Sequence, residues 1–118
     1  MRIRRARWPD ETYEVTIRHD VETNVVVSER WEKEGLAHRE HGPALISRDP
    51  ITGVIIDEKW FKNNELHRDH GPADILRKPD GRVYYSAWYQ HGEKVPSPRR
   101  ARRVGKASGQ TPSPSVGP

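Results

Sequence analysis

A motif that runs from Trp31 to Ala44 recurs from Trp60 to Ala73, 29 positions further along the chain. Both copies share a tryptophan, a His-Arg pair, a second histidine and a Gly-Pro-Ala run, and a third copy begins at Trp88 and then breaks off. A fixed period in this range is the signature of a repeat protein, in which each unit packs on its neighbours. The recurrent structural residues are Trp31, Trp60, Trp88, His38, Arg39, Gly42, Pro43, His67, Arg68, Gly71 and Pro72.

The segments that end in these tryptophans read as β-strands. They are residues 25–31, 54–60 and 82–88. All three are rich in β-branched or aromatic side chains, which suit a pleated surface. Asn24, Gly53 and Gly81 precede them, and these residue types tolerate the positive φ that tight hairpin turns require. We therefore predict an all-β fold, an antiparallel meander of six strands in three repeated hairpins, with the tryptophans stacked on one another along one face.

Composition divides the chain into three parts. Hydrophobic and charged residues each make up 32% of the 118 residues, which favours stacked repeats with a thin core over one large core. Residues 1–11 are interpreted as a basic leader, residues 12–95 as the repeat domain, and residues 96–118 as a disordered tail rich in Pro, Ser and Arg. The repeat units span about residues 15–43, 44–72 and 73–95.

A net positive charge is found only at the two ends of the chain. Residues 8–95 hold 12 Lys/Arg and 17 Asp/Glu, so the body is mildly acidic. The tail has no acidic residue, and its cations would attract phosphate backbones or an acidic protein in a salt-sensitive manner. The alternative is a tail that only confers solubility. The tail cations are Arg99, Arg100, Arg102, Arg103 and Lys106.

Two absences bear on compartment and cofactor. The chain has no cysteine, which excludes a disulfide framework or a Cys-based zinc site and is compatible with a reducing cytosol. No apolar run approaches the roughly 18 residues of a membrane span. The leader is not followed by the apolar stretch of a secretory signal. We expect a cytoplasmic protein with no membrane partner and no cofactor.

Two His-x-x-His pairs are the sharpest chemical signal. They are His38 with His41 and His67 with His70. Two such pairs can supply four nitrogen ligands to zinc. The preferred interpretation is structural: the first histidine and the following arginine tie the connector to the neighbouring hairpin, and the second histidine lies on the surface. No acid–base pair or activated nucleophile is singled out, so we predict no catalytic residue.

The pattern Trp-x-x-Asn/Gly-Glu-Leu-His-Arg-x-x-Gly-Pro-Ala resembles the variant MORN-type repeats, which are short β-hairpin repeats of many small bacterial and phage proteins. The resemblance covers about residues 24–95, as two full units and a truncated third. It implies a β-sheet repeat fold and an interaction role, as in a small inhibitor or accessory factor, and it carries no catalytic residues.

Aromatic side chains are the candidates for a protein-binding surface. In a sheet with few layers some aromatics must face outward, and aromatics beside arginine are typical of binding hot spots. The alternative is cross-strand packing on the second face of the sheet. The candidates are Phe61, Tyr84, Tyr85 and Tyr89.

The edge strands of an open meander, near residues 13–18 and at the Trp88 end, favour strand-to-strand dimerisation unless the leader or the tail covers them. Taken together, the residues predict a non-catalytic module that binds another protein. One alternative is a nucleic-acid-associated protein held by its basic ends. The other is a metal-binding protein that uses the four paired histidines.

Overall fold

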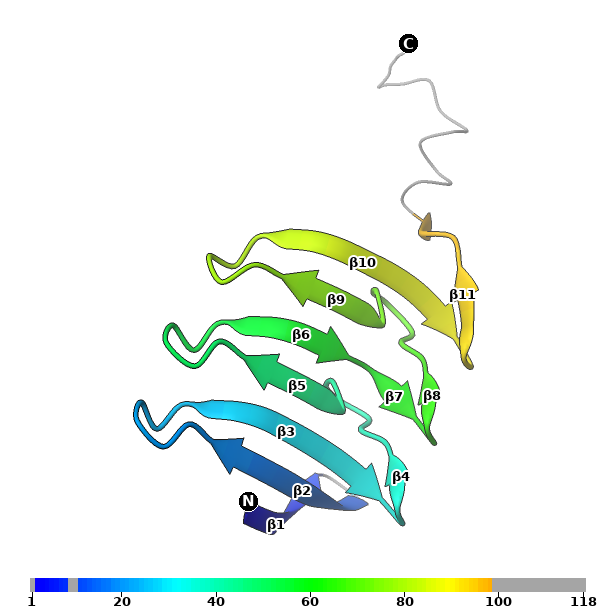
Figure 1. The fold of residues 1–118 in the computed structure, drawn as a ribbon. Coiled ribbons are helices and arrows are strands. Elements are labelled where there is room, and N and C mark those ends of the chain that lie inside the picture. Colours follow the sequence, from blue (N-terminus) through cyan, green and yellow to red (C-terminus); the bar gives the residue numbers. More distant parts are fainter. Residues whose placement is uncertain (1, 9–10, 99–118) are drawn as a thin grey trace.

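The computed structural model describes residues 2–8 and 11–98, with side chains from Thr12 onward. These residues form eleven β-strands, and the main sheet runs in the order β1-β2-β3-β5-β6-β9-β10-β11 with antiparallel neighbours (Figure 1). The predicted all-β meander of repeated hairpins is confirmed. Within the described residues, no helix has the length and apolar character needed to cross a bilayer. The predicted disordered tail lies outside the described residues from position 99 onward.

Six strands correspond to the six predicted from the sequence. They are β2 (Glu11–His19), β3 (Val26–Lys33), β5 (Leu45–Arg48), β6 (Ile55–Lys59), β9 (Asp74–Arg77) and β10 (Val83–Gln90). The other five are β1 (Arg2–Trp8), β4 (Leu36–Ala37), β7 (Phe61–Lys62), β8 (Glu65–Leu66) and β11 (Glu93–Val95). Four of these five are short: β4, β7 and β8 lie in the connectors between hairpins, and β11 follows the last hairpin.

The basic leader is part of the sheet. Strand β1 pairs antiparallel with β2 along its whole length, from Arg2 opposite Ile17 to Trp8 opposite Glu11. Its many arginines obscure a strand pattern, so the sequence predicts a leader separate from the repeat domain. Backbone hydrogen bonds to an open neighbouring strand do not depend on side-chain alternation. As a result, β2 is not an exposed edge.

The hairpin tips follow the predicted turn chemistry. Asn24, Gly53 and Gly81 have φ of 63°, 78° and 96°. In the first two tips an aspartate, Asp20 or Asp49, accepts hydrogen bonds from backbone N–H groups two and three residues later. These hydrogen bonds lower the pKa of both carboxyl groups. The tips are therefore stabilised locally, before any packing between repeats.

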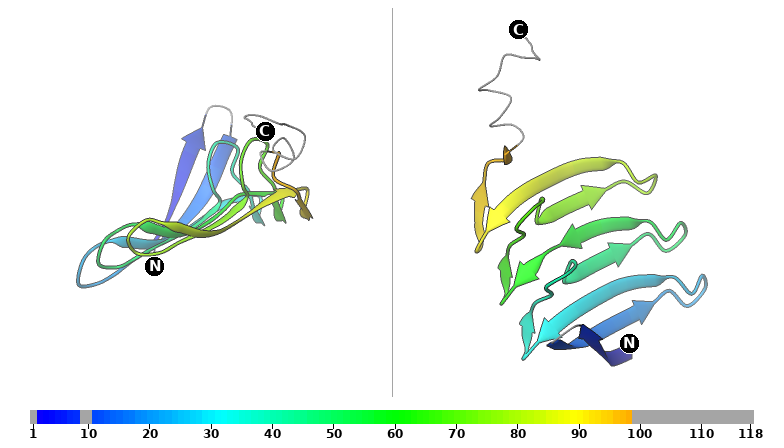
Figure 2. Two further views of the ribbon diagram at one scale, coloured as in Figure 1. Left: turned by 90° about the horizontal axis from the view of Figure 1, so that it is seen from above. Right: turned by 180° about the vertical axis from the view of Figure 1, so that it is seen from behind.

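Each hairpin also carries a β-bulge at the same place. The strand pairing shifts register at Val27, Ile56 and Tyr84, which are aligned positions of the three units. A bulge increases the local right-handed twist and bends the strand. Seen from above, the sheet is accordingly curved rather than flat (Figure 2).

A second, tighter turn follows each long hairpin. Its two central residues both have positive φ, as in a type I′ turn. The pairs are Glu34 and Gly35, Asn63 and Asn64, and His91 and Gly92. All three of these turns lie at the ends of the strands opposite the hairpin tips, and the connectors begin there (Figure 1).

The core is thin and lies against one face of the sheet. Tyr13, Val15 and Ile17 form its buried cluster, with Val26 and Trp31 packed against them. The pairing places Val15 opposite Trp31. Further along the stack, the small or aliphatic side chains of Ala44, Ile46, Ala73 and Ile75 are buried on the same face. We call it the tryptophan face.

The predicted stack of tryptophan rings is wrong. Equivalent positions of neighbouring repeats are two strands apart, about 9.5 Å, whereas paired aromatic rings have centroids about 4.5–7 Å apart. The space is filled by arginine instead. The guanidinium carbon of Arg39 lies 3.5 Å from the ring centroid of Trp31. That of Arg68 lies 3.7 Å from the ring centroid of Trp60.

Candidate functional site

Each of the first two repeats contains a sandwich of tryptophan, arginine and glycine, which we call the Trp–Arg–Gly unit. In the first unit, Arg39 lies over Trp31 and donates a hydrogen bond from Nη1 to the carbonyl of Pro43 at 3.2 Å. A Cβ atom on Gly42 would lie 2.8 Å from the guanidinium carbon. The recurrence of glycine here therefore reflects close approach of a side chain. The second unit consists of Trp60, Arg68 and Gly71.

A half-buried carboxylate completes each unit and ties it to the next strand. The indole N–H of Trp31 donates to Glu29 at 3.0 Å, and Arg48 on β5 forms an ion pair with Glu29 at 2.7 Å. Burial raises the pKa of Glu29, but the hydrogen bonds from Trp31 and Arg48 and the charge of Arg48 outweigh it. The net effect is a pKa below the ordinary value. Glu58 is the equivalent of Glu29, bonded to Trp60 and Arg77.

The first histidine of each pair is buried and fully used within the scaffold. His38 and His67 are only 4% and 5% exposed. Nδ1 of His38 accepts the backbone N–H of Asn63 at 3.1 Å, so the ring proton lies on Nε2, which faces Glu40 at 2.7 Å. His67 repeats the pattern with the N–H of His91. A ring with both nitrogens engaged in this way has no lone pair left for a metal or a substrate proton.

Backbone hydrogen bonds join each connector to the next repeat. The N–H of Arg39 donates to the carbonyl of Phe61 at 3.2 Å, and that of Asn64 donates to the carbonyl of Ala37 at 2.9 Å. The N–H of Arg68 likewise donates to the carbonyl of Tyr89. These contacts agree with the structural interpretation of the His-Arg pairs. They also place Phe61 and Tyr89, both half-buried, within the contacts between repeats.

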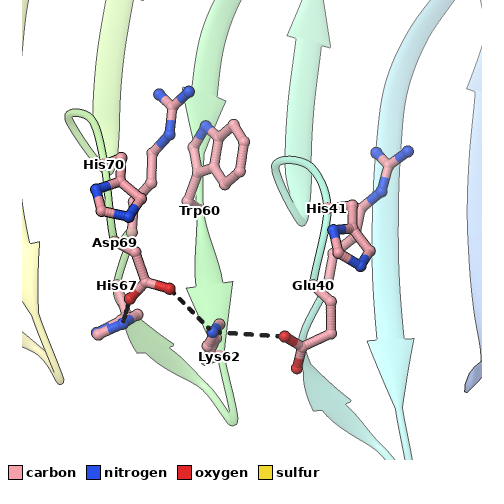
Figure 3. A pocket seen from close by; sticks show the side chains of 9 residues that line it. Glu40, His41, Trp60, Lys62, His67, Asp69 and His70 are labelled. Carbon is pink, nitrogen blue, oxygen red and sulfur yellow. Dashed lines mark hydrogen bonds and ion pairs between the residues drawn. The ribbon is translucent and has the colours of Figure 1, made fainter.

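A hollow of about 370 Å³ opens between the first two connectors (Figure 3). At its base, Lys62 bridges the two repeats, with Nζ at 3.4 Å from Glu40 and 3.8 Å from Asp69. The hydrogen bond from His67 and the charge of Lys62 lower the pKa of Asp69. The carboxylates of the hollow are thus already paired. Its lining residues are Arg39, Glu40, His41, Trp60, Lys62, His67, Arg68, Asp69 and His70.

The four paired histidines do not converge on one point. His38 and His67 belong to successive connectors and bond different turns, while His41 and His70 are exposed at the rim of the hollow. Among the side chains described, no three His, Asp or Glu residues are grouped as a metal ion would require. The described geometry thus does not assemble the four-histidine zinc site.

Strand β10 differs from its counterparts β3 and β6 at the outer edge of the last repeat. Residues 28–30 of β3 are Ser-Glu-Arg and residues 57–59 of β6 are Asp-Glu-Lys, but residues 85–87 of β10 are Tyr-Ser-Ala. The edges of β3 and β6 pair with β5 and β9. Within the described residues, residues 83–87 of β10 pair on one side only, with β9.

Exposed apolar side chains gather on this open edge. Val83, Tyr84 and Tyr85 are 53%, 60% and 38% exposed, and Lys94 lies 5.9 Å from the ring centroid of Tyr85. Of the four aromatic candidates, Tyr84 and Tyr85 are therefore brought together and Phe61 and Tyr89 are not. Sequence reasoning missed Val83, Ser86 and Ala87, although comparing the three units would have shown the loss of charge. The tail cations Arg99, Arg100, Arg102, Arg103 and Lys106 lie outside the described residues.

No family model matches the chain, and no curated protein or solved structure matches it either. Two features stand out: the inter-repeat hollow, whose polar groups hold the scaffold together, and the uncharged open edge of β10.

Proposed function

We propose that this chain is a non-catalytic protein-interaction module that presents the open edge of β10 to a protein partner. The observation that carries the proposal is the uncharged segment of residues 83–87, in which Val83, Tyr84 and Tyr85 are exposed. The unpaired N–H and C=O groups of a sheet edge are a template for strand addition, and proteins usually block such edges with charge. Here the charges present in β3 and β6 are lost from β10, the one of these three equivalent strands whose outer edge has no neighbour over this segment in the described chain.

The use of the reactive side chains supports a scaffold rather than an enzyme. Histidine–carboxylate pairs are the most chemically capable groups of the described chain, and both hold connectors in place. The resemblance of the motif to variant MORN-type repeats supports the same role. It also suggests a small cytoplasmic inhibitor or accessory factor of bacterial or phage origin as part of this proposal.

A pull-down with matched variants tests this function. The tagged full chain is incubated with nuclease-treated lysate of the source cells, beside Tyr85→Asp/Ser86→Glu, which restores the charges found on β6. The control is Val21→Asp, because Val21 is 98% exposed in the turn between β2 and β3. That turn belongs to the first hairpin of the stack, whereas β10 belongs to the last (Figure 1). We expect the wild type and the control to retain the same protein. The edge variant should retain at least about tenfold less, as loss of a binding hot spot predicts.

Retention of equal protein by the edge variant would contradict the proposal. Material that disappears after nuclease treatment or at raised salt would instead favour the nucleic-acid alternative, in which the five tail cations contact phosphates.

A further inference from the structure

The inner repeats show which strands their outer edges accept. Strand β5 joins β3 with Arg48 paired to Glu29 at 2.7 Å. Strand β9 joins β6 with Arg77 paired to Glu58 at 2.9 Å, and with Asp74 at 3.3 Å from Lys59. Each incoming strand therefore brings charges that complement those of its acceptor.

The edge of β10 lacks the charged side chains that receive the next repeat in β3 and β6. Ser86 stands at the position of Glu29 and Glu58, so an incoming arginine would have no carboxylate partner. Val95 and Pro96 occupy the positions of the histidine and arginine that hold the next turn. The edge of β10 thus disfavours the addition of a further repeat of the same kind. For the same reason it disfavours a head-to-tail stack, in which the first repeat of another copy would add to this edge. It suits an extended segment without charge.

Resting on the interaction role proposed above, we infer that the partner is a second copy of this chain, joined by antiparallel pairing of the two β10 strands about a two-fold axis at Tyr85. The chain itself supplies the uncharged segment that the edge requires, because residues 83–87 are Val-Tyr-Tyr-Ser-Ala. Every other described strand of four or more residues carries at least one charged side chain. Only β10 therefore matches its own edge.

The two-fold register makes the contact self-complementary. Tyr85 lies opposite Tyr85 of the second copy, Ser86 lies opposite Tyr84, and Ala87 lies opposite Val83. No charge is placed against a like charge, and aromatic cross-strand pairs stabilise antiparallel sheets. Strand β11 occupies the same edge only from Trp88 to Gln90, so it leaves this segment open. Five residues per strand form less than a standard interface of about 1,600 Å², and the dimer is accordingly reversible and concentration-dependent.

Sedimentation of the full chain over a concentration series tests the dimer. We expect the mean mass to rise from that of the 13.7 kDa monomer towards twice that value. Tyr85→Asp/Ser86→Glu should raise the dissociation constant at least about tenfold, while Val21→Asp leaves it unchanged. The edge variant should keep the fold because aspartate and glutamate occupy these positions in β6, where Glu58 accepts the indole N–H of Trp60.

A single cysteine tests the register, since the chain has none of its own. Under mild oxidation the full-length Tyr85→Cys variant should form a disulfide-linked dimer, because residues on the two-fold axis face each other within disulfide reach. Val21→Cys should form far less. Equal cross-linking of both variants, or self-association that survives Tyr85→Asp/Ser86→Glu, would overturn the inference. A chain that stays monomeric but still captures a lysate protein through Tyr85 would overturn the dimer and leave the interaction role standing.

Discussion

At the scale of single residues, the repeated motif is explained by the packing of one guanidinium. Arg68 lies between the ring of Trp60 and the backbone of Gly71, and its Nη1 donates to the carbonyl of Pro72 at 3.1 Å. Burial lowers the pKa of Arg68, and the charge of Glu58 opposes that effect. The arginine therefore recurs because it fills a space between repeats that is too wide for ring-on-ring stacking.

Gly71→Ala should destabilise the chain by about 1–2 kcal/mol, since the new Cβ would lie 2.6 Å from the Arg68 guanidinium carbon and displace it from Trp60. Urea unfolding of the variant measures this cost. A double-mutant cycle with Arg68→Ala identifies the cause, because the cost of Gly71→Ala should largely vanish when Arg68 is absent. A cost that stays the same in the Arg68→Ala background would mean that the glycine is needed for another reason.

Glu29 should contribute to acid lability. Its folded-state pKa lies below the ordinary value of 4.5, so the folded state is stabilised by the charged carboxylate above that pH. This contribution is lost as the pH falls from about 4.5 through the folded-state pKa. Unfolding free energies of Glu29→Gln should therefore decline less steeply between pH 5 and pH 3 than those of the wild type. Parallel pH profiles for the two proteins would contradict this assignment.

At the scale of elements, the tight second turn of each repeat is the point of contact with its neighbour. In the second repeat, the backbone N–H of Asn64 donates to the carbonyl of Ala37, and the side-chain Oδ1 accepts the N–H of Ala37 at 2.8 Å. Asn64 also has φ of 69°, which most residues avoid. One residue thus serves the turn and the junction between repeats together.

Asn64→Ala should cost about 2 kcal/mol, because it combines the strain of positive φ with the loss of one hydrogen bond between repeats. Asn64→Gly is the matched control, since glycine occupies the equivalent positions 35 and 92 and accepts this φ. The control should cost less than the alanine variant in chemical denaturation. If both variants lose the same free energy, backbone strain has no part in the effect.

At the scale of the whole molecule, the stack has two unlike ends. The first hairpin is covered by β1, which pairs with all of β2, whereas the last hairpin presents residues 83–87 of β10 with one strand neighbour in the described chain. Strand β1 is also an edge in the described chain, but it contains four arginines, whereas residues 83–87 carry no charge. Strand addition is therefore directed to the β10 end of the stack. The charged side chains between neighbouring repeats are paired with one another, whereas residues 83–87 at the β10 end carry no charge.

Hydrogen exchange should report this asymmetry. In dilute solution, the outward-facing amides among residues 85–87 should exchange at least about tenfold faster than those of the aligned residues 28–30 and 57–59, which pair with β5 and β9. Raising the protein concentration should slow exchange in β10 and leave β3 and β6 unchanged. Equal protection of all three strands in dilute solution would show that the last edge is already covered.

The sequence by itself determined the repeat period, the hairpins and the turn positions, since these depend on residues close together in the chain. Asn24, Gly53 and Gly81 mark the tips through their own φ preferences. Two other features follow only from how the hairpins are placed side by side. Equivalent positions of neighbouring repeats are two strands apart, and β2 has an outer edge to which β1 can pair. For this reason the tertiary structure alone decided that Arg39 covers Trp31, that β1 completes the sheet, and that β11 covers only residues 88–90 of the last edge.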